Sequence, residues 1–285
     1  MIALRSFIFR KVTIVGVGLI GGSLALAMKK HKLAKEIVGV SQKQSTLEWA
    51  LKNQVIDQAC PDVKKAVTNA DLVVLATPVG VISAMMSTIA PHIRRNCIVT
   101  DVGSTKTSIV NAAQSFLPNK TLFVGSHPLA GSEKRGVEHA TADLFANSLC
   151  LLTATANTSR GAVARVKTMW TTVGCRVKSI SCEEHDQVMA YISHLPHVLA
   201  YSLMEVVPTE YFEYAAQGLK DTTRVAGSSP QMWQEICLAN GKNIIQSIDQ
   251  VVGVLSTLRK AMAAGDQKIL LDHFTNAKNR RDKLV

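Results

Sequence analysis

The chain has 285 residues, of which 47% are hydrophobic and 19% are charged, so it can bury a sizeable core. This composition excludes a disordered or low-complexity protein, and the length favours about two domains of ordinary size. Basic residues outnumber acidic ones by 32 to 21, and the net charge of +11 favours anionic partners such as phosphorylated cofactors and dicarboxylic metabolites. Aromatic residues make up only 5%, which leaves few platforms for base stacking, so we expect no nucleic-acid partner.

Six cysteines are scattered through the chain and form no C-x-x-C pair. In a chain of this length, that spacing is typical of reduced thiols in a cytoplasmic protein rather than of disulfides or a zinc site. Neither an H-E-x-x-H motif nor a Walker G-x-x-x-x-G-K motif is present. We therefore expect a cytoplasmic protein without a bound metal.

An uncharged run at residues 12–28 has two interpretations. Basic residues precede it and Ala25-Leu26-Ala27 fits a small-x-small cleavage site, so a secretory signal peptide is one of them. The other is a ligand-binding loop and a helix, which the closely spaced glycines of the run favour. The run is shorter than the ~20 residues of a spanning helix, and positive charge flanks it on both sides. We favour the second interpretation and expect no membrane partner.

The first part of the chain alternates short apolar segments with helix-length periodic segments. We expect strands at residues 11–15, 37–40, 72–76, 97–101, 122–124, 149–153 and 176–179. We expect helices between them at residues 21–32, 44–53, 79–89, 105–116 and 160–173. Nearly all-apolar strands that alternate with helices indicate a parallel sheet covered on both faces. The prediction is an α/β fold in which residues 1–180 form a Rossmann-type parallel sheet domain.

Beyond residue 180 the chain shows no further convincing strand. Periodic segments at residues 183–206, 211–216, 230–263 and 266–284 predict an all-helical domain over residues 181–285. The third segment carries an apolar stripe at helical spacing that includes Ile244, Ile248, Val251, Leu255 and Leu258. A long stripe on a small domain favours packing against a second copy, so we expect a homodimer that forms through this domain. The alternative is a stripe that packs against its own domain.

The first predicted strand runs into a glycine-rich turn, and a helix follows. This is the G-x-G-x-x-G motif of dinucleotide-binding domains in its proper context. Gly16 permits the tight turn, Gly18 lets a pyrophosphate approach the backbone, and Gly21 allows close packing of helix on strand. Leu19 and Ile20 lie at the start of the helix, where phosphates bind, and are predicted to contact the cofactor as well. The alternative is a plain loop that uses these glycines for its turns.

The end of the second predicted strand indicates which dinucleotide binds. An NAD site has an acidic residue there, which accepts a hydrogen bond from the ribose 2′-hydroxyl. This chain has no carboxylate there before Glu48, and we predict cofactor contacts from Ser41, Gln42, Lys43 and Thr46. Hydroxyls and an ammonium suit a 2′-phosphate, so NADP is the predicted cofactor and NAD the alternative. Lys43 can also be a solvated loop cation.

Polar residues follow the next three predicted strands, and open α/β sheets bind ligands at the carboxyl ends of their strands. Thr77 and Pro78 follow the third strand, and Asp101 and Gly103 lie at the end of the fourth, so we predict that all four contact the cofactor. His127 follows the fifth strand in a predicted loop, where a histidine can act as a catalytic base. Position alone is equally compatible with a structural role for His127.

Five motifs occur in order over nearly the whole chain, and together they are far more specific than any one of them. They are Gly16-x-Gly18-Leu19-Ile20-Gly21-Gly22-Ser23, Asp101-x-Gly103-Ser104-x-Lys106, His127-Pro128-x-Ala130-Gly131, Ser193-His194-Leu195-Pro196-His197 and Asp221-Thr222-Thr223-Arg224. In these motifs the chain resembles the prephenate/arogenate dehydrogenases of tyrosine biosynthesis.

The resemblance implies a role for each matching residue. His127 is expected to hydrogen-bond the ring hydroxyl of the substrate and to accept its proton as hydride leaves, and Ser104 is expected to orient that histidine. Arg224 is implied as the anchor of a substrate carboxylate, with Lys220 as a second cation. The other implied substrate residues are His194 and His197, the acidic gate residues Glu133 and Asp221, and Trp233, for which core packing is the alternative.

The implied activity is oxidative decarboxylation of prephenate to 4-hydroxyphenylpyruvate, or of arogenate to tyrosine, with hydride transfer to NADP or NAD. Tyrosine is expected to inhibit by competition at the active site, because the chain ends at Val285 without room for a regulatory domain. One alternative is a β-hydroxyacid dehydrogenase or imine reductase, which the His127-Pro128 loop disfavours. Another is a nicotinamide-sensing protein without chemistry, which has no need for His127, Ser104 and Arg224 together.

Overall fold

The computed structural model describes residues 7–131 and 134–284. Within these residues an eight-stranded sheet has the order β3-β2-β1-β4-β5-β6-β7-β8. The strands are β1 (Phe9–Val15), β2 (Ala34–Val40), β3 (Gln58–Ala59), β4 (Leu72–Leu75), β5 (Ile98–Asp101), β6 (Phe123–Pro128), β7 (Leu149–Thr153) and β8 (Arg176–Ile180). The order reverses beside β1, which pairs with both β2 and β4, and such a reversal opens a ligand-binding crevice at the carboxyl ends of the strands.

Helices cover both faces of the sheet, as the nearly all-apolar strands predict. Every residue of β4 and β5 is buried. Leu24 and Trp170 pack on one face, and Ile82 and Ile109 pack on the other. The helices of this part are α1 (Leu19–Lys30), α2 (Gln44–Lys52), α3 (Val63–Val67), α4 (Val79–Ile89), α5 (Thr107–Phe116) and α6 (Arg160–Thr172), with short 3-10 turns at Lys120–Leu122 and Val137–His139. The α/β class and the Rossmann-type arrangement are therefore confirmed.

The sheet departs from the predicted parallel arrangement at its last two strands, β7 and β8, which run parallel to each other and antiparallel to the other six. β7 runs antiparallel to β6 and pairs His127 with Leu151. This pairing extends β6 to Pro128, beyond the predicted end at residue 124. The prediction of His127 in a loop was wrong, because the pairing partner lies more than twenty residues along the chain and no local pattern reveals it. His127 is consequently held by a strand instead of a mobile connection.

In the sheet domain, the strand β3 and the helix α3 were not predicted. β3 has two residues and α3 has five, which is too short for a hydrophobic period to be recognised. The side chain of Asp62 caps α3 by accepting a hydrogen bond from the Lys64 backbone N–H (3.0 Å). β3 pairs with β2 at the edge of the sheet, and Ala66 and Val67 of α3 are buried in the core that packs against it.

The sheet ends at Ile180, and helices follow from Cys182 onward; we propose that the two domains divide here. The predicted helix at residues 183–206 is nearly continuous, with a π-helical turn η3 in its middle. The predicted helix at residues 230–263 is in fact two helices, because Asn240 leaves the helical conformation between them (φ −117°, ψ 24°). The helical part contains α7 (Cys182–Met189), η3 (Ala190–His194), α8 (Leu195–Val206), a 3-10 turn (Thr209–Tyr214), α9 (Gln217–Thr223), η5 (Arg224–Gly227), α10 (Pro230–Ala239), α11 (Gly241–Ala264) and α12 (Gln267–Arg281).

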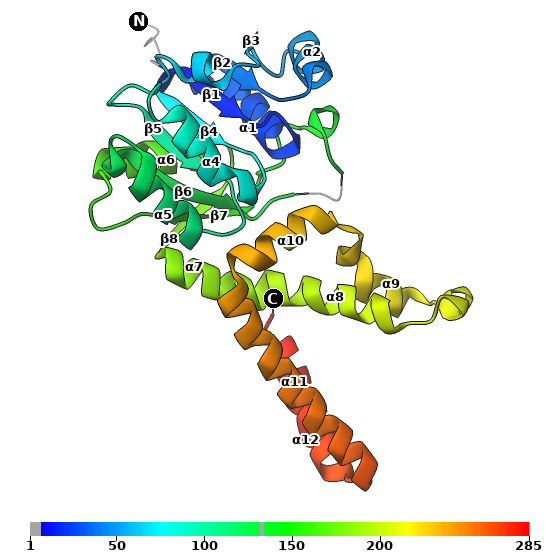
Figure 1. Cartoon of the computed structure of the whole chain (residues 1–285). Helices are drawn as coiled ribbons and strands as arrows, with labels where there is room; N and C mark the ends of the chain where they lie inside the picture. The colour runs from blue at the N-terminus through cyan, green and yellow to red at the C-terminus, as the bar shows by residue number, and fades with distance from the viewer. Residues whose placement is uncertain (1–6, 132–133, 285) are drawn as a thin grey trace, which may run out of the picture.

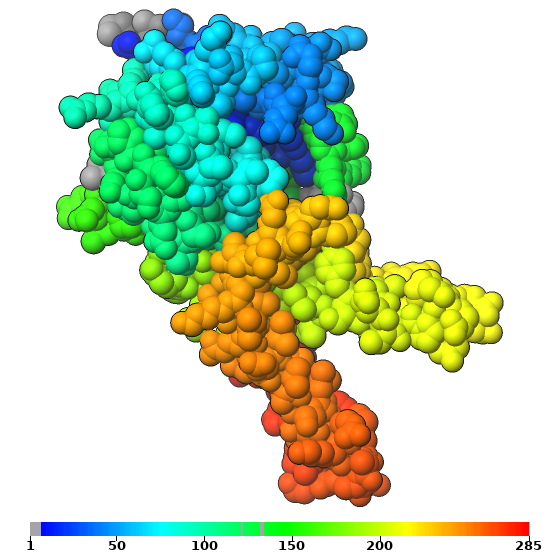
Figure 2. Space-filling view, in the orientation of Figure 1, coloured from blue at the N-terminus to red at the C-terminus, as the bar shows by residue number. Residues whose placement is uncertain are grey.

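The helical part projects from the sheet domain as two arms (Figure 1). One arm consists of α11 and α12, and the other contains the far end of α8 together with α9. The space-filling view shows that both arms stand clear of the sheet domain (Figure 2). Among the described residues, no helix combines the length and apolarity that crossing a membrane requires.

Candidate active site

The glycine turn after β1 has the shape of a phosphate-binding loop. Gly16 has φ +102°, and a Cβ there would lie 2.5 Å from the Ala76 carbonyl oxygen at the end of β4. A Cβ on Gly21 would lie 2.1 Å from the Gly16 carbonyl oxygen, so helix α1 packs closely on the turn. A Cβ on Gly18, by contrast, would meet no described atom within 4 Å, which leaves open space in front of the backbone. Leu19 and Ile20 begin α1 beside that space.

Across the crevice, Thr77 and Pro78 connect the end of β4 at Leu75 to the start of α4. The Thr77 hydroxyl is buried and has no hydrogen-bond partner among the described residues. Buried polar atoms are normally satisfied, so this hydroxyl suits a bound ligand. The close turn, the open space at Gly18 and the unsatisfied Thr77 fit a nicotinamide dinucleotide.

The loop after β2 is mostly exposed where the adenosine end of such a cofactor would lie. Ser41 Oγ accepts a hydrogen bond from the Lys43 backbone N–H (3.2 Å), while the Gln42 and Lys43 side chains are exposed and Thr46 is half-buried. The first carboxylate, Glu48, points along α2, where its side chain accepts a hydrogen bond from Gln44 (3.2 Å).

Asp101 and Gly103 lie at the end of β5, but the Asp101 carboxylate is already occupied by protein donors. It accepts hydrogen bonds from the backbone N–H groups of Gly103 (2.9 Å) and Ser126 (3.1 Å). It also pairs with the Lys106 ammonium, and both side chains are fully buried. Although we predicted a cofactor contact for Asp101, its observed contacts are those of a residue that joins the ends of β5 and β6 and shapes the Ser104 loop.

His127 is hydrogen-bonded to a side chain that the sequence did not point to. Its Nδ1 lies 2.9 Å from His185 Nε2, and His185 Nδ1 lies 2.8 Å from Asp186 Oδ1. Asp186 also accepts hydrogen bonds from the backbone N–H groups of Lys106 (2.7 Å) and Thr107 (2.8 Å) at the start of α5. We name His127, His185 and Asp186 the imidazole relay. Its only sequence signal is an adjacent histidine and aspartate at the start of the helical part.

The surroundings of the relay favour neutral imidazoles. Burial lowers the pKa of His127 well below its ordinary value of 6.5, and electrostatic interactions with the basic side chains of His185, Lys106 and His194 lower it further. Burial also lowers the pKa of His185, against the opposing effect of Asp186. Burial alone would raise the pKa of Asp186, but hydrogen bonds from His185, Thr107 and Lys106 hold it below its ordinary value. The relay therefore contains two neutral imidazoles and a carboxylate at neutral pH.

Two further histidines and Trp233 gather beside His127. His197 stacks on Trp233, with ring centroids 3.7 Å apart and planes inclined by 24°, and its Nδ1 donates to the Ser193 carbonyl oxygen (2.8 Å). His194 meets the same indole edge-on at 5.9 Å. The buried His194 accepts a hydrogen bond from Asn240 Nδ2 (3.1 Å), and burial lowers its pKa to about 4. The backbone of Ser104 faces His194, so the β5 loop joins this group.

The predicted charged residues of α9 and η5 are all exposed. Arg224 is close enough to His197 to lower its pKa, although burial lowers that pKa more. Lys220 and Asp221 are exposed on α9, and Asp221 accepts a hydrogen bond from Gln217 Nε2 (2.7 Å). Glu133, the other predicted gate residue, lies outside the described residues. The structure thus gathers His127, Ser104, His194, His197 and Trp233, with Arg224 beside them.

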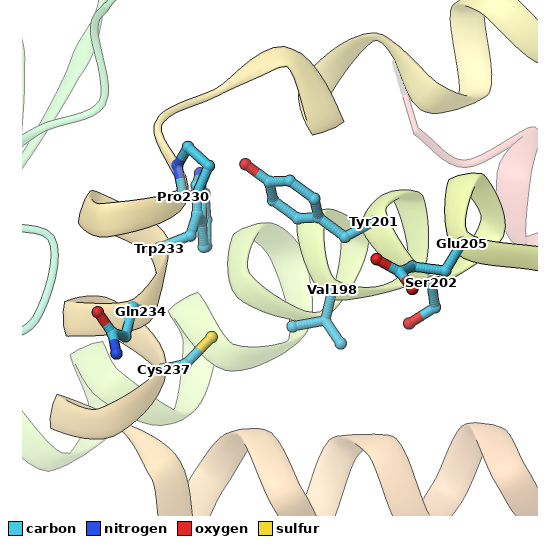
Figure 3. A pocket seen from close by; sticks show the side chains of 8 residues that line it. All are labelled: Val198, Tyr201, Ser202, Glu205, Pro230, Trp233, Gln234 and Cys237. Atoms are coloured by element: carbon cyan, nitrogen blue, oxygen red, sulfur yellow. The ribbon is translucent and has the colours of Figure 1, made fainter.

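An apolar pocket of about 350 Å³ adjoins Trp233 on the helical side. Figure 3 shows Trp233 and Cys237 of α10 facing Val198 and Tyr201 of α8 across it. The Tyr201 hydroxyl donates to the Ser228 carbonyl oxygen (2.9 Å), which ties α8 to the segment before α10. Trp233 is thus held between the histidines on one side and this pocket on the other.

Comparisons with known proteins agree with this geometry. Residues 24–179 match the family described as prephenate dehydrogenase, nucleotide-binding domain, and residues 181–276 match prephenate dehydrogenase, dimerization domain. The chain is 35% identical to a cyclohexadienyl dehydrogenase of Zymomonas mobilis over 96% of both chains. It is 37% identical to a prephenate dehydrogenase of Bacillus subtilis over 96% of this chain and 76% of that one.

A solved structure shows the same family similarity. The prephenate dehydrogenase from A. aeolicus in complex with hydroxyphenyl propionate and NAD+ superposes with a TM-score of 0.90 at 30% identity, covering 99% of this chain and 100% of the other. Both parts of the chain, and the sheet and helices together, match one family. The chain belongs to the prephenate dehydrogenase family and is a nicotinamide-dependent dehydrogenase.

Proposed function

We propose that this protein catalyses the oxidative decarboxylation of prephenate or arogenate. The main observation that supports the proposal is the position of His127. It lies at the end of β6, on the same sheet edge as the glycine turn, and beside the aromatic group of His194, His197 and Trp233. A neutral imidazole between a dinucleotide cradle and an aromatic-lined space is suited to oxidising a ring alcohol.

The reaction needs one proton acceptor and a clamp for an anionic ring. The neutral His127 accepts the proton of the ring hydroxyl as the C–H bond of the carbinol carbon breaks and its electron pair leaves as hydride. When bound, the nicotinamide supplies the hydride acceptor. The bond to the ring carboxylate then breaks, CO₂ leaves, and its electron pair makes the ring aromatic. His127 returns its proton to the phenolate oxygen, so the base is regenerated.

The remaining residues bind and orient the substrate in this proposal. Arg224 can hold a carboxylate through a bidentate, charge-assisted contact. His197, held by its stacking on the buried Trp233, is proposed to pack against the ring of a cyclic substrate. Ser104, on the loop between β5 and α5, is proposed to orient His127 and contact the same hydroxyl. We propose Lys220 and Asp221 as more peripheral contacts on α9.

Steady-state rates with prephenate and arogenate, each with NADP and NAD, test the proposal directly. We expect reduced nicotinamide and CO₂ to form in equal amounts with at least one substrate. His127→Asn should lower kcat by about 10²–10⁴, the usual contribution of a positioned acid–base group. His31→Asn, an exposed histidine at the end of α1, is the matched control and should keep full activity. Absence of turnover with both substrates would contradict the proposal.

We propose NADP as the preferred cofactor. Support comes from the exposed loop after β2, which offers Ser41, Lys43 and Thr46 and keeps Glu48 turned along α2. A 2′-phosphate gains charge-assisted hydrogen bonds from such groups, whereas NAD gains none of them and meets no repulsion. NAD is therefore expected to serve more weakly.

We propose a homodimer that forms through the helical part, with tyrosine as a competitive inhibitor. Val252, Leu255 and Met262 of α11 are between 57% and 60% exposed in the single chain, and Phe274 of α12 is 54% exposed. Large apolar side chains exposed along two packed helices favour burial against a second copy. Tyrosine shares the phenol ring and a carboxylate with the reacting molecules, so it can occupy the same contacts.

All six cysteines are free thiols, which supports the proposed cytoplasmic location.

A further inference from the structure

The imidazole relay joins β6 of the sheet domain to α7 of the helical part through the contact between His127 and His185. His185 is fully buried, and Asp186 is 1% exposed. The relay connects residues 58 positions apart in the sequence, so it forms only when the two parts pack together. The proposed reaction does not require His185 or Asp186 to touch the substrate.

The hydrogen-bond partners of Asp186 determine which ring nitrogen carries the proton in His185 and, through it, in His127. Its two carboxylate oxygens face the backbone N–H groups of Lys106 and Thr107, which can only donate. The third partner, His185 Nδ1, must also donate, because an ionised carboxylate only accepts. A neutral His185 with its proton on Nδ1 has a lone pair on Nε2. That lone pair faces His127 Nδ1, which must therefore carry a proton.

The proton on His127 Nδ1 leaves its other nitrogen, Nε2, with a free lone pair. This is the state that a general base needs. In the opposite tautomer of His127, two lone pairs would face each other across the 2.9 Å contact to His185 Nε2, which is unfavourable. The direction of every hydrogen bond in the relay therefore follows from the two backbone donors at the start of α5.

We propose that His185 and Asp186 are positioning residues that hold His127 in its Nδ1–H tautomer, keep Nε2 ready to accept the substrate's proton, and stabilise the imidazolium formed when it does. This inference rests on the proposed function for the role of His127 as the base. The tautomer itself is a property of the protein without ligands. No atom of the relay other than His127 Nε2 needs to contact the substrate.

The charged groups around His127 disfavour its protonated form, so the imidazolium needs a negative group to stabilise it. Lys106 and His194 both disfavour positive charge on His127, and Asp101 is already paired with Lys106. Asp186 is the negative group that the relay itself contains, and it acts on His127 through the intervening imidazole. In serine proteases, the carboxylate that orients a catalytic histidine and stabilises its imidazolium contributes about 10⁴ to kcat.

The test compares relay variants with a matched exposed carboxylate on the same helix. Asp186→Asn and His185→Leu are expected to lower kcat by about 10²- to 10³-fold with little change in the KM for substrate or cofactor. His185→Gln keeps one acceptor and one donor, so it should recover part of the loss seen with His185→Leu. Glu184→Gln, which changes an exposed carboxylate of α7, should leave kcat unchanged.

A second measurement reads the tautomer without catalysis. Nitrogen-15 NMR of His127 in the cofactor-free protein should show Nδ1–H in the wild type and in Glu184→Gln, and a shift toward Nε2–H in Asp186→Asn and His185→Leu. Wild-type protein with His127 in the Nε2–H tautomer would overturn the inference, as would folded relay variants with unchanged kcat. Because this readout needs no turnover, it remains decisive if neither prephenate nor arogenate is a substrate.

Discussion

Glu235 of α10 accepts a hydrogen bond from the backbone N–H of Gly80 in the first turn of α4 (2.9 Å), which ties the helical part to the sheet domain. α4 begins directly after Thr77 and Pro78, and α10 carries Trp233 two residues before Glu235. The contact therefore links the cofactor side of the crevice to the aromatic group. A carboxylate at the start of a helix is also favoured by the helix dipole.

Loss of this contact should weaken the association of the two parts. Glu235→Ala is expected to lower the free energy of unfolding by about 1 kcal/mol, because Glu235 is half-buried and the net worth of a hydrogen bond is modest. Glu235→Gln keeps an acceptor oxygen and should lose less. Gly80→Ala should displace the Glu235 carboxylate at little net change in stability, since its Cβ would lie 2.9 Å from Cδ of this flexible side chain and alanine favours the helix. Thermal denaturation of the three variants checks the order, and equal stability of Glu235→Ala and wild type would refute it.

Folding stability should fall in acid because of His194. Burial lowers its pKa from 6.5 to about 4, against the effect of nearby Asp186 and together with those of His185 and His197. Its folded-state pKa lies below the unfolded one, so its contribution is complete above about pH 6.5 and is lost as the pH falls toward 4. In that window each unit of pH should cost about 1.4 kcal/mol from this group alone.

Denaturant titrations at several pH values measure that slope. In His194→Asn the free energy of unfolding should change less steeply with pH between 6.5 and 4, by the equivalent of about one proton bound on unfolding. This holds whatever the stability of the variant at neutral pH. His31→Asn is the exposed control and should keep the wild-type slope. An unchanged slope in His194→Asn would assign the acid sensitivity to other groups.

Arg224→Ala should mainly raise the KM for the substrate. A carboxylate contact that is equally strong in the ground and transition states affects binding and leaves kcat largely intact. The loss of a charged hydrogen-bond partner corresponds to about 1.5–3 kcal/mol, or roughly a tenfold to 150-fold rise in KM. Lys220→Ala, which removes an exposed cation of α9, should have a smaller effect. If KM is unchanged in Arg224→Ala, this arginine is not the carboxylate anchor.

Ser41→Asp should reverse the cofactor preference. An aspartate at the end of β2 repels a 2′-phosphate and offers an acceptor to a free 2′-hydroxyl. The wild type is expected to have the higher kcat/KM with NADP, and the variant with NAD. Ser45→Asn, a neutral change at an exposed position at the start of α2, is the control and should keep the wild-type ratio. A wild type that already prefers NAD, or a variant with the same ratio, shows that this loop does not recognise the 2′ position.

The helical part should hold two copies together. Sedimentation of the purified protein at micromolar concentration is expected to show a dimer. Leu255→Glu, which places a charge among the exposed apolar residues of α11, should shift it to monomers, whereas Gln250→Glu on an exposed polar position should not. A stable, active wild-type monomer would contradict the proposed homodimer.

Short sequence patterns were sufficient to predict the features that depend only on neighbouring residues. All-apolar strands such as β4 predicted a covered sheet, because a strand buried on both faces consists mostly of apolar residues. The turn at Gly16 was recognisable because only glycine readily adopts its positive φ and leaves room for Ala76. Gly16, Gly18 and Gly21 were therefore evident within a few residues of one another.

Motifs along the chain identified most residues of the candidate site but not the contacts that organise it. His127 was identified, yet its strand depended on antiparallel pairing with Leu151, and a strand gives no local sign of its partner. The break of the long helix at Asn240 depended on the Asp186 carbonyl oxygen, which receives a hydrogen bond from the Asn240 side chain (2.7 Å).

By itself, the sequence determined the class of fold, the cofactor turn and the family, because these depend on short-range periodicity and on residues close together in the chain. Only the tertiary structure decided which nitrogen of His127 faces a partner and which group that partner is. His185 and Asp186 become significant because β6 and α7 are packed together, burying both side chains so that their polar atoms must be paired. Residues joined across 58 positions have no shared pattern in a single sequence, so the state of the base is a property of the folded protein.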